Sequence, residues 1–275
     1  MTKISFSTLA CPDWDLPKVL AAAANYGYHG VELRGISREL DLWKLPEFSP
    51  AALADTRRLF ESHGLVVPVL GSSAGFHSDN SFERQRNEES VLRMAEVAIG
   101  LGSPAIRVFG DQIELGNARG QTAGWIADSL GRLADGLSSS GVQVWLESHG
   151  SFVTSRDLLD IFVHLDNPAI GIVWDPANAF AESGELPTIH RQLSFRVRHV
   201  HLKDMIRTAL GIAKYVLTGE GAIPFAAIIA ELAGIEFGGF VSFEWEKHWH
   251  PELADPEVAL PHFMKWWRSF EEHDV

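Results

Sequence analysis

The segment VRHVHLKD, residues 197–204, carries His199, His201 and Lys203 at alternate positions between apolar residues. Alternate side chains of a β-strand point to the same face, so a strand here would place two imidazoles and one ammonium group in a row. Imidazoles bind metals and transfer protons near neutral pH, and an ammonium group binds anions. Such groups on a mostly buried strand predict a site that neighbouring strands complete.

Five other apolar segments also end in polar side chains. They contribute Glu32 and Arg34 (GVELRG), Arg107 and Asp111 (IRVFGD), Glu147 and His149 (VWLESHG), Asp175 and Asn178 (VWDPAN), and Glu244 and Glu246 (VSFEWE). If Glu147, Asp175 and Glu244 converge in a dry site, their carboxylates repel one another and a divalent cation relieves the repulsion. Three carboxylates and one imidazole suit Mn²⁺, Mg²⁺ or Co²⁺, and ligand type alone leaves Zn²⁺ open. The alternative is that each acid is a solvated rim residue or an ion-pair partner.

The segments that must position these residues alternate along the whole chain between short apolar runs and longer runs with the period of a helix. We expect strands at residues 4–9, 30–34, 66–71, 105–109, 142–147, 170–175, 197–203 and 240–245, and helices at 16–26, 50–63, 82–101, 122–139, 155–165, 186–193, 223–233 and 256–272. Several predicted helices are followed by a glycine, such as Gly102 and Gly141, which adopts the left-handed helix stop at low cost.

Strict alternation of strand and helix predicts parallel strands with right-handed crossovers. Eight repeats predict an α/β fold, a (β/α)8 TIM barrel formed by residues 1–275 as a single domain without a linker. An open doubly wound sheet shares much of this pattern, but its glycine-rich phosphate loops are absent from the sequence. In a barrel the carboxyl ends of all strands meet at one face, so the polar strand ends would converge there.

Composition narrows the class of protein. The 275 residues carry a formal net charge of -13, which disfavours nucleic acid as a partner because its phosphates are repelled. No apolar run is long enough to cross a membrane, and the N-terminus lacks the apolar core of a secretion signal. Cys11 is the only cysteine, so an internal disulfide is excluded. We therefore expect a cytoplasmic protein and leave open a homo-oligomer.

Seven stretches, taken in order, resemble one known family. They are GVELRG, LGSPAIRVFG, VWLESHG, VWDPANAF, RHVHLKD, GEGAIPF and VSFEWE. Together they are similar to the xylose-isomerase-like TIM barrels of the sugar phosphate isomerase/epimerase group, over essentially the whole chain. That group includes ketose 3-epimerases, inosose isomerases and dehydratases, and hydroxypyruvate isomerases, so the resemblance does not choose one reaction.

The resemblance implies one divalent metal, with Mn²⁺ preferred over Mg²⁺, Co²⁺ or Zn²⁺. Its ligands would be Glu147, Asp175, His201 and Glu244. Glu147 and Glu244 would also be the catalytic base and acid. His199 would then support the ligands or pack in the core. The implied activity is that of a metal-dependent isomerase or epimerase of carbohydrate metabolism, acting on a small sugar, sugar phosphate or polyol ketone through a metal-stabilised enediolate.

The expected substrate-binding residues surround this set. They are Glu32, Arg34, Arg107, His149, Asn178, Lys203 and Glu220. Arginine suits a carboxylate or phosphate, although Arg107 could instead neutralise a neighbouring acid. Asn178 stands where the ketose epimerases of the group carry a histidine, which weakens assignment to the epimerases.

Three alternatives remain open. The same metal site serves a dehydratase of an inosose or hydroxy-keto acid. A DNA-repair nuclease of the endonuclease-IV type would need a three-zinc cluster and a basic DNA-binding face, which the net charge of -13 disfavours. A non-catalytic sugar-binding protein would keep the barrel without needing the paired glutamates.

Overall fold

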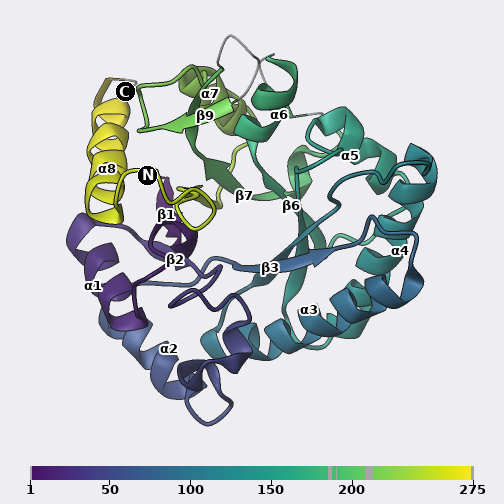
Figure 1. Ribbon diagram of the computed structural model, residues 1–275, viewed down its shortest axis with the longest axis horizontal. Helices are drawn as coiled ribbons and strands as arrows, with labels where there is room; N and C mark the ends of the chain where they lie inside the picture. The colour runs from purple at the N-terminus through teal and green to yellow at the C-terminus, as the bar shows by residue number, and fades with distance from the viewer. Residues whose placement is uncertain (1, 185–187, 190, 208–212, 274–275) are drawn as a thin grey trace.

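The computed structural model describes residues 2–184, 188–189, 191–207 and 213–273. Eight parallel strands form one sheet in the order β2-β1-β10-β7-β6-β5-β4-β3, with helices outside it (Figure 1). The strands are β1 (Lys3–Ser7), β2 (Gly30–Glu32), β3 (Leu70–Gly75), β4 (Ala105–Phe109), β5 (Gln143–Glu147), β6 (Ile170–Trp174), β7 (Val197–Leu202) and β10 (Phe240–Phe243).

The two edge strands of this sheet meet and close it. Isolated parallel bridges join Gly30 to Val66 and Leu33 to Leu70. Across the same seam, the N–H of Val31 donates to the carbonyl of Val66 at 2.9 Å. Closure confirms the predicted (β/α)8 barrel and brings all strand carboxyl ends to one face.

The outer ring consists mainly of eight α-helices. They are α1 (Leu16–Tyr26), α2 (Leu53–Ser62), α3 (Ser81–Leu101), α4 (Arg119–Leu137), α5 (Ser155–Phe162), α6 (Pro176–Ser183), α7 (Phe225–Gly234) and α8 (Pro256–His273). Local sequence sets their ends. For example, the Asp15 side chain accepts the N–H of Lys18 to cap α1, and Gly27 ends that helix with a φ of 86°.

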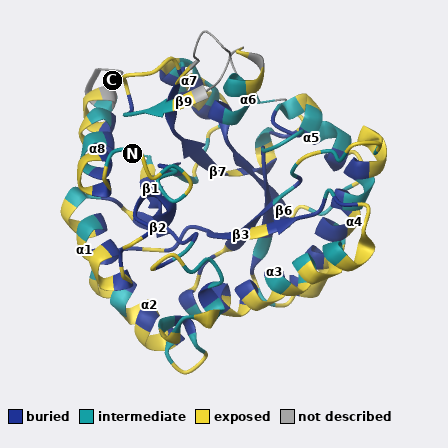
Figure 2. Ribbon diagram, viewed as in Figure 1, coloured by how far each residue is buried: buried dark blue, intermediate teal, exposed yellow. Residues whose placement is uncertain are grey.

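The strands alternate between two buried environments. In β5, Val144 and Leu146 pack outward against the helices, whereas Trp145 and Glu147 point into the barrel. Trp145 belongs to a small apolar cluster with Val69, Ala105 and Val173. Figure 2 shows the result, with buried strands inside and exposed outer faces on the helices. Because successive side chains of a strand point to opposite faces, the outward residues pack against the helices and the inward residues are available to form a site.

Two segments differ from the sequence-based expectation. The third strand was expected at residues 66–71 but β3 spans Leu70–Gly75, because Pro68 has no N–H to donate to the sheet. The sixth helix was expected at 186–193; residues 185–187 and 190 lie outside the described part, and the helix after β6 is α6, which begins at Pro176. Here Asp175 caps α6, since its side chain accepts the N–H of Asn178.

A two-stranded hairpin was not expected. Its strands, β8 (Asp204–Arg207) and β9 (Ala213–Val216), pair antiparallel directly after β7. Within the described residues, no helix has both the length and the apolarity needed to cross a membrane.

Candidate metal centre

Four buried residues bring their ligand atoms together at the carboxyl ends of neighbouring strands. Glu147 ends β5, Asp175 follows β6, His201 lies near the end of β7, and Glu244 follows β10. One ligand atom from each lies within 4.8 Å of the other three. Strand order explains the convergence, because β10, β7, β6 and β5 are successive neighbours in the sheet.

The donor set fits a divalent cation. His201 Nδ1 is a buried atom without a hydrogen-bond partner, while Glu147 Oε2 and Asp175 Oδ2 are buried carboxylate oxygens whose close contacts are the cations of Arg107 and Lys203. His201 Nδ1 lies 3.3 Å from Glu244 Oε1 and 3.7 Å from Glu147 Oε2. Buried carboxylate oxygens and an imidazole nitrogen aimed at one point are the arrangement that a metal ion satisfies. These four residues could therefore hold one.

The other ring nitrogen of His201 faces a carboxylate beneath the cluster. His201 Nε2 lies 3.1 Å from both carboxylate oxygens of Glu32, and His199 Nε2 lies 3.0 Å from one of them. Glu32 is completely buried. Although burial raises the pKa of the Glu32 carboxyl, the two histidines hold it well below its ordinary value. We assign the Nε2 proton of His201 to the hydrogen bond with Glu32, which leaves Nδ1 free to bind a metal.

Lys203 neutralises the acidic side of the cluster. Its Nζ lies 2.7 Å from Asp175 Oδ2, 2.6 Å from Glu244 Oε2 and 2.7 Å from Glu246 Oε1. Burial lowers the pKa of Lys203, but these carboxylates together keep it well above its ordinary value. From β9, Tyr215 donates its hydroxyl to Glu246 at 3.0 Å. The hairpin thereby supports the network, a role that no sequence pattern signalled.

Arg107 occupies the opposite side, next to Glu147. Its Nε lies 3.0 Å from Glu147 Oε2, its Nη1 donates to the carbonyl of Ser72 at 2.9 Å, and its guanidinium lies 4.0 Å from the Phe109 ring centre. Burial raises the pKa of Glu147, yet Arg107 and His201 bring it well below its ordinary value. The structure thus places Arg107 as the partner of an acid, which was one of its two expected roles.

Glu244 differs from Glu147 in its environment. Burial raises the pKa of Glu244 to about 7, the negative charge of Glu147 acts in the same direction, and His201 and Lys203 oppose them. Two neighbouring carboxyl groups with separated pKa values are a common arrangement for a base and an acid.

A cavity of about 210 Å³ opens above the cluster. Its charged lining comprises Arg34, Arg107, Glu147, Lys203, Glu244 and Glu246. His149 also lines it, and its Nδ1 lies 3.6 Å from Asp111 Oδ1. The apolar part of the wall comes from Leu9, Phe109 and Trp249, which the sequence did not single out as a group.

Three expected substrate-binding residues are not part of this lining. Glu32 lies beneath the histidines, and the Asn178 side chain donates to the carbonyl of Ser148 at 3.2 Å. Glu220 is exposed in its turn. That turn is held by Asp204, whose Oδ2 accepts the N–H groups of Gly219 and Gly221 at 2.8 and 2.9 Å.

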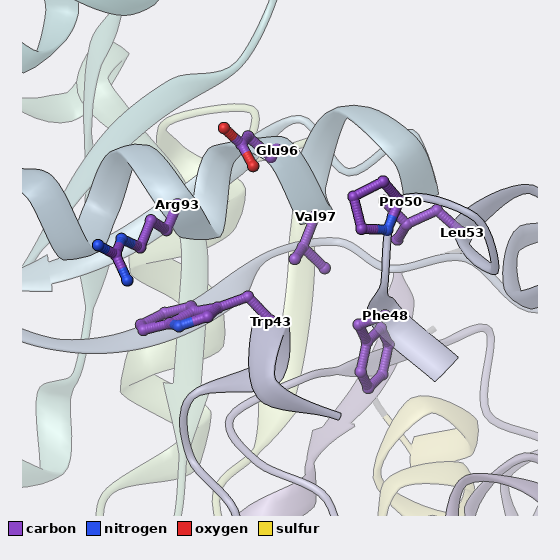
Figure 3. Close-up of a pocket in the computed structure, with 7 residues that line it drawn as sticks. All are labelled: Trp43, Phe48, Pro50, Leu53, Arg93, Glu96 and Val97. Carbon is purple, nitrogen blue, oxygen red and sulfur yellow. The ribbon is translucent and has the colours of Figure 1, made fainter. Parts of the chain in front are cut away.

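A larger hollow of about 310 Å³ lies elsewhere, against α3 (Figure 3). Trp43, Phe48 and Val97 form much of its wall, and Arg93 and Glu96 are the charged residues lining it. It contains none of the four ligand residues, so the smaller cavity is the candidate active site.

Comparison with known proteins identifies the family. The model of the xylose isomerase-like TIM barrel family matches residues 20–270. The chain belongs to this family.

Among curated relatives, inosose dehydratase 1 of Bacillus cereus is 26% identical over 152 residues, which are 49% of this chain and 50% of that protein. The chain thus matches about half the length of that relative. The rhizopine catabolism protein MocC of Rhizobium meliloti is 22% identical over 279 residues, covering 90% of this chain and 78% of that protein.

Solved structures share the fold. The IolI protein, crystallised with a bound zinc atom, superimposes with a TM-score of 0.79 at 20% identity and covers 96% of this chain and 95% of its own. A D-tagatose 3-epimerase-like protein gives a TM-score of 0.77 at 20% identity and covers 99% of both chains.

Proposed function

We propose that this protein is a metal-dependent isomerase or epimerase that moves a proton on the carbon beside the carbonyl of a small sugar, sugar phosphate or polyol ketone. The observation that carries the proposal is the pair of buried glutamates, Glu147 and Glu244, which belong to one ligand cluster and have pKa values shifted in opposite directions. An epimerisation, in which the proton leaves from one face and is returned to the other, uses one group that accepts and one that donates.

Strand order supports these roles. Strands β5 and β10 are separated in the sheet by β6 and β7, so Glu147 and Glu244 approach the cavity from different sides. Arg107 favours the ionised form of Glu147, which suits a base, and burial raises the pKa of Glu244, so that it takes up a proton more readily than Glu147 and suits the acid. A substrate between them can lose a proton on one side and receive one on the other.

The four ligand residues would hold the divalent ion that this reaction requires. The bound ion would act as a Lewis acid, polarising the carbonyl so that the neighbouring C–H becomes acidic. Glu32 would fix the ring of His201, and Lys203 would hold the carboxyl groups of Asp175 and Glu244 in place through its ion pairs with both. We propose Mn²⁺ because three of the four donors are carboxylates, with Zn²⁺ the chief competitor, since IolI was crystallised with zinc.

A dehydratase is the second candidate function. It is favoured by the match to inosose dehydratase 1 and by Asn178, which stands where the epimerases of the family carry a histidine. Elimination of a β-hydroxyl begins with the same proton abstraction, and Lys203 and Glu246 line the cavity where a leaving hydroxyl needs a proton donor.

Proton exchange with solvent tests both functions at once. The protein, loaded separately with Mn²⁺, Co²⁺, Mg²⁺ and Zn²⁺, would be incubated in D₂O with ketoses, inososes and hydroxy-keto acids and followed by NMR. We expect metal-dependent deuterium incorporation beside the carbonyl, with an epimer, isomer or dehydrated product identifying the reaction. Loss of exchange in Glu147→Gln, with the exposed Glu252→Gln as control, would assign it to the site. Absence of exchange with every metal and substrate would contradict the proposal.

A further inference from the structure

Arg34 is a buried cation of the cavity wall that forms no ion pair with another described residue. Two residues beyond β2, its side chain lines the cavity, and the residue is 4% exposed. Its Nη2 donates to Ser73 Oγ at 2.7 Å, while its Nη1 is buried and has no hydrogen-bond partner. None of the ion pairs between described residues includes Arg34, whereas Lys203 and Arg107 contact carboxylates at 3.0 Å or less.

The surroundings of Arg34 make the burial of its charged guanidinium group energetically unfavourable. Burial lowers the pKa of Arg34 to about 9 and the positive charge of Arg107 acts in the same direction, while the more distant charges of Glu147, Glu244 and Glu32 oppose them in part. The two side chains flank Gly71, where an added Cβ would lie 2.7 Å from Arg34 Cδ and 2.8 Å from Arg107 Nη2. The backbone therefore leaves room for two adjacent guanidinium groups, although only Arg107 has an acidic partner among the described residues. A buried charge without a counter-charge destabilises a fold unless a ligand supplies one.

We propose that Arg34 binds an anionic group of the substrate, a carboxylate or a phosphate, so that the substrate is a small anionic hydroxyketone. This inference rests on the proposed function for the reacting end of the substrate. Guanidinium N–H groups match both anions in geometry, and the unpartnered Nη1 of Arg34 supplies a donor. Leu9 and Trp249 supply an apolar part of the wall of the same cavity.

The size of the cavity agrees with such a substrate. At about 210 Å³ it is smaller than a pocket for a drug-sized ligand, for which about 300–1,000 Å³ is common. An anion held at Arg34 would leave the rest of the molecule directed toward Glu147 and Glu244, which line the same space. Arg34 would thereby select among substrates without taking part in proton transfer.

Three hydroxyketones that differ in one group test the inference by calorimetry. They are dihydroxyacetone, which is neutral, hydroxypyruvate, which carries a carboxylate, and dihydroxyacetone phosphate. Each would be titrated into Mn²⁺-loaded and into chelator-treated protein. The variants would be Arg34→Gln and Arg34→Lys, with Arg38→Gln as the matched control, because Arg38 is exposed and pairs with Asp13. Thermal melting would show that each variant folds.

We expect the wild type to bind at least one of the two anions about 10- to 100-fold more tightly than dihydroxyacetone, since hydrogen bonds to charged groups contribute that much. Arg34→Gln should lose this preference for anions, while its affinity for dihydroxyacetone stays unchanged. Arg34→Lys should keep part of the preference, and Arg38→Gln should keep all of it. Which anion is preferred distinguishes a carboxylate from a phosphate.

An equal affinity for all three compounds, binding of none of the anions, or a preference that survives in Arg34→Gln would overturn the inference. If Arg34→Gln does not fold, a preference that is reduced in Arg34→Lys supports the inference, and a preference equal to that of the wild type overturns it. The proposed function fails separately, through absence of deuterium exchange, while an Arg34-dependent anion preference in chelator-treated protein would stand without it.

Discussion

The two sides of the ligand cluster balance charge differently. On the β4–β5 side, Arg107 pairs with one carboxylate, that of Glu147. On the β7–β10 side, Lys203 is shared among Asp175, Glu244 and Glu246. The first side is neutral and its acid is ionised, whereas the second has an excess of negative charge and an acid whose pKa burial raises to about 7. Identical glutamates thus become suited to different roles through the cations beside them.

The largest effect should follow from removing either acid. Glu147→Gln and Glu244→Gln should each lower kcat by about 10²- to 10⁴-fold, because amides neither accept nor donate the transferred proton. Turnover of the substrate found by deuterium exchange measures this, with Glu252→Gln as the exposed control. Wild-type rates in both variants would show that the difference in charge balance between the two sides does not serve catalysis.

The next effect concerns stability. Lys203→Met would leave three buried carboxylates without their shared cation, and we expect the free energy of unfolding to fall by about 3–5 kcal/mol in chelator-treated protein. Arg107→Met leaves one carboxylate unpaired and should cost less. Urea denaturation compares them, with Lys44→Met, which disrupts an exposed pair with Asp41, as control. Equal losses in the two variants would show that the sides do not differ in charge balance.

Metal affinity should depend on the two neighbouring histidines unequally. His201→Ala removes the nitrogen that faces Glu147 and Glu244, whereas His199→Ala removes a contact with Glu32 and ring packing against Trp145 and His201. Changes in the support of ligands commonly weaken metal binding about 10- to 100-fold, and we expect His201→Ala to exceed that range and His199→Ala to stay within or below it. Titration with Mn²⁺ measures both. The reverse order would transfer the ligand role to His199.

The smallest effect is a dependence on pH. The pKa of Glu244 in the folded chain is raised by burial to about 7, so the stability that its protonated form contributes is present below its unfolded value and is lost as pH rises through about 7. Burial lowers the pKa of His201, but Glu244, Glu32 and Glu147 raise it well above its ordinary value, which acts in the same direction. Chelator-treated protein should therefore lose stability as pH rises from about 4.5 through about 7.

Mn²⁺ binding should show the opposite trend. Because the metal requires Glu244 and His201 without their protons, affinity should increase over the same pH interval and protons should be released. Calorimetry in buffers of different ionisation enthalpy measures both. Affinity that falls as pH rises would contradict the assignment of these ligands.

Much of the architecture could be predicted because its causes are local. Alternation of apolar strands with capped helices is visible in the sequence, and β4 and α1 begin and end at the expected residues. The match of the family model and the closed sheet confirm the predicted family and fold. Two-residue periodicity also placed His199 and His201 on one face of a strand, since that periodicity belongs to the strand itself.

The arrangement within the site depended on contacts between residues distant in the sequence. Glu32 lies 169 residues from His201, and barrel closure decides that it supports a histidine instead of facing the cavity. Likewise, which strands become neighbours decides that Lys203 pairs with three carboxylates, whereas Arg34 forms no ion pair with another described residue. By itself the sequence determined which residues are titratable and which face of each strand they occupy. Tertiary structure decided their partners, because the partners come from segments that are distant in the sequence. Those partners then set the pKa of each group and whether it is free to bind a ligand.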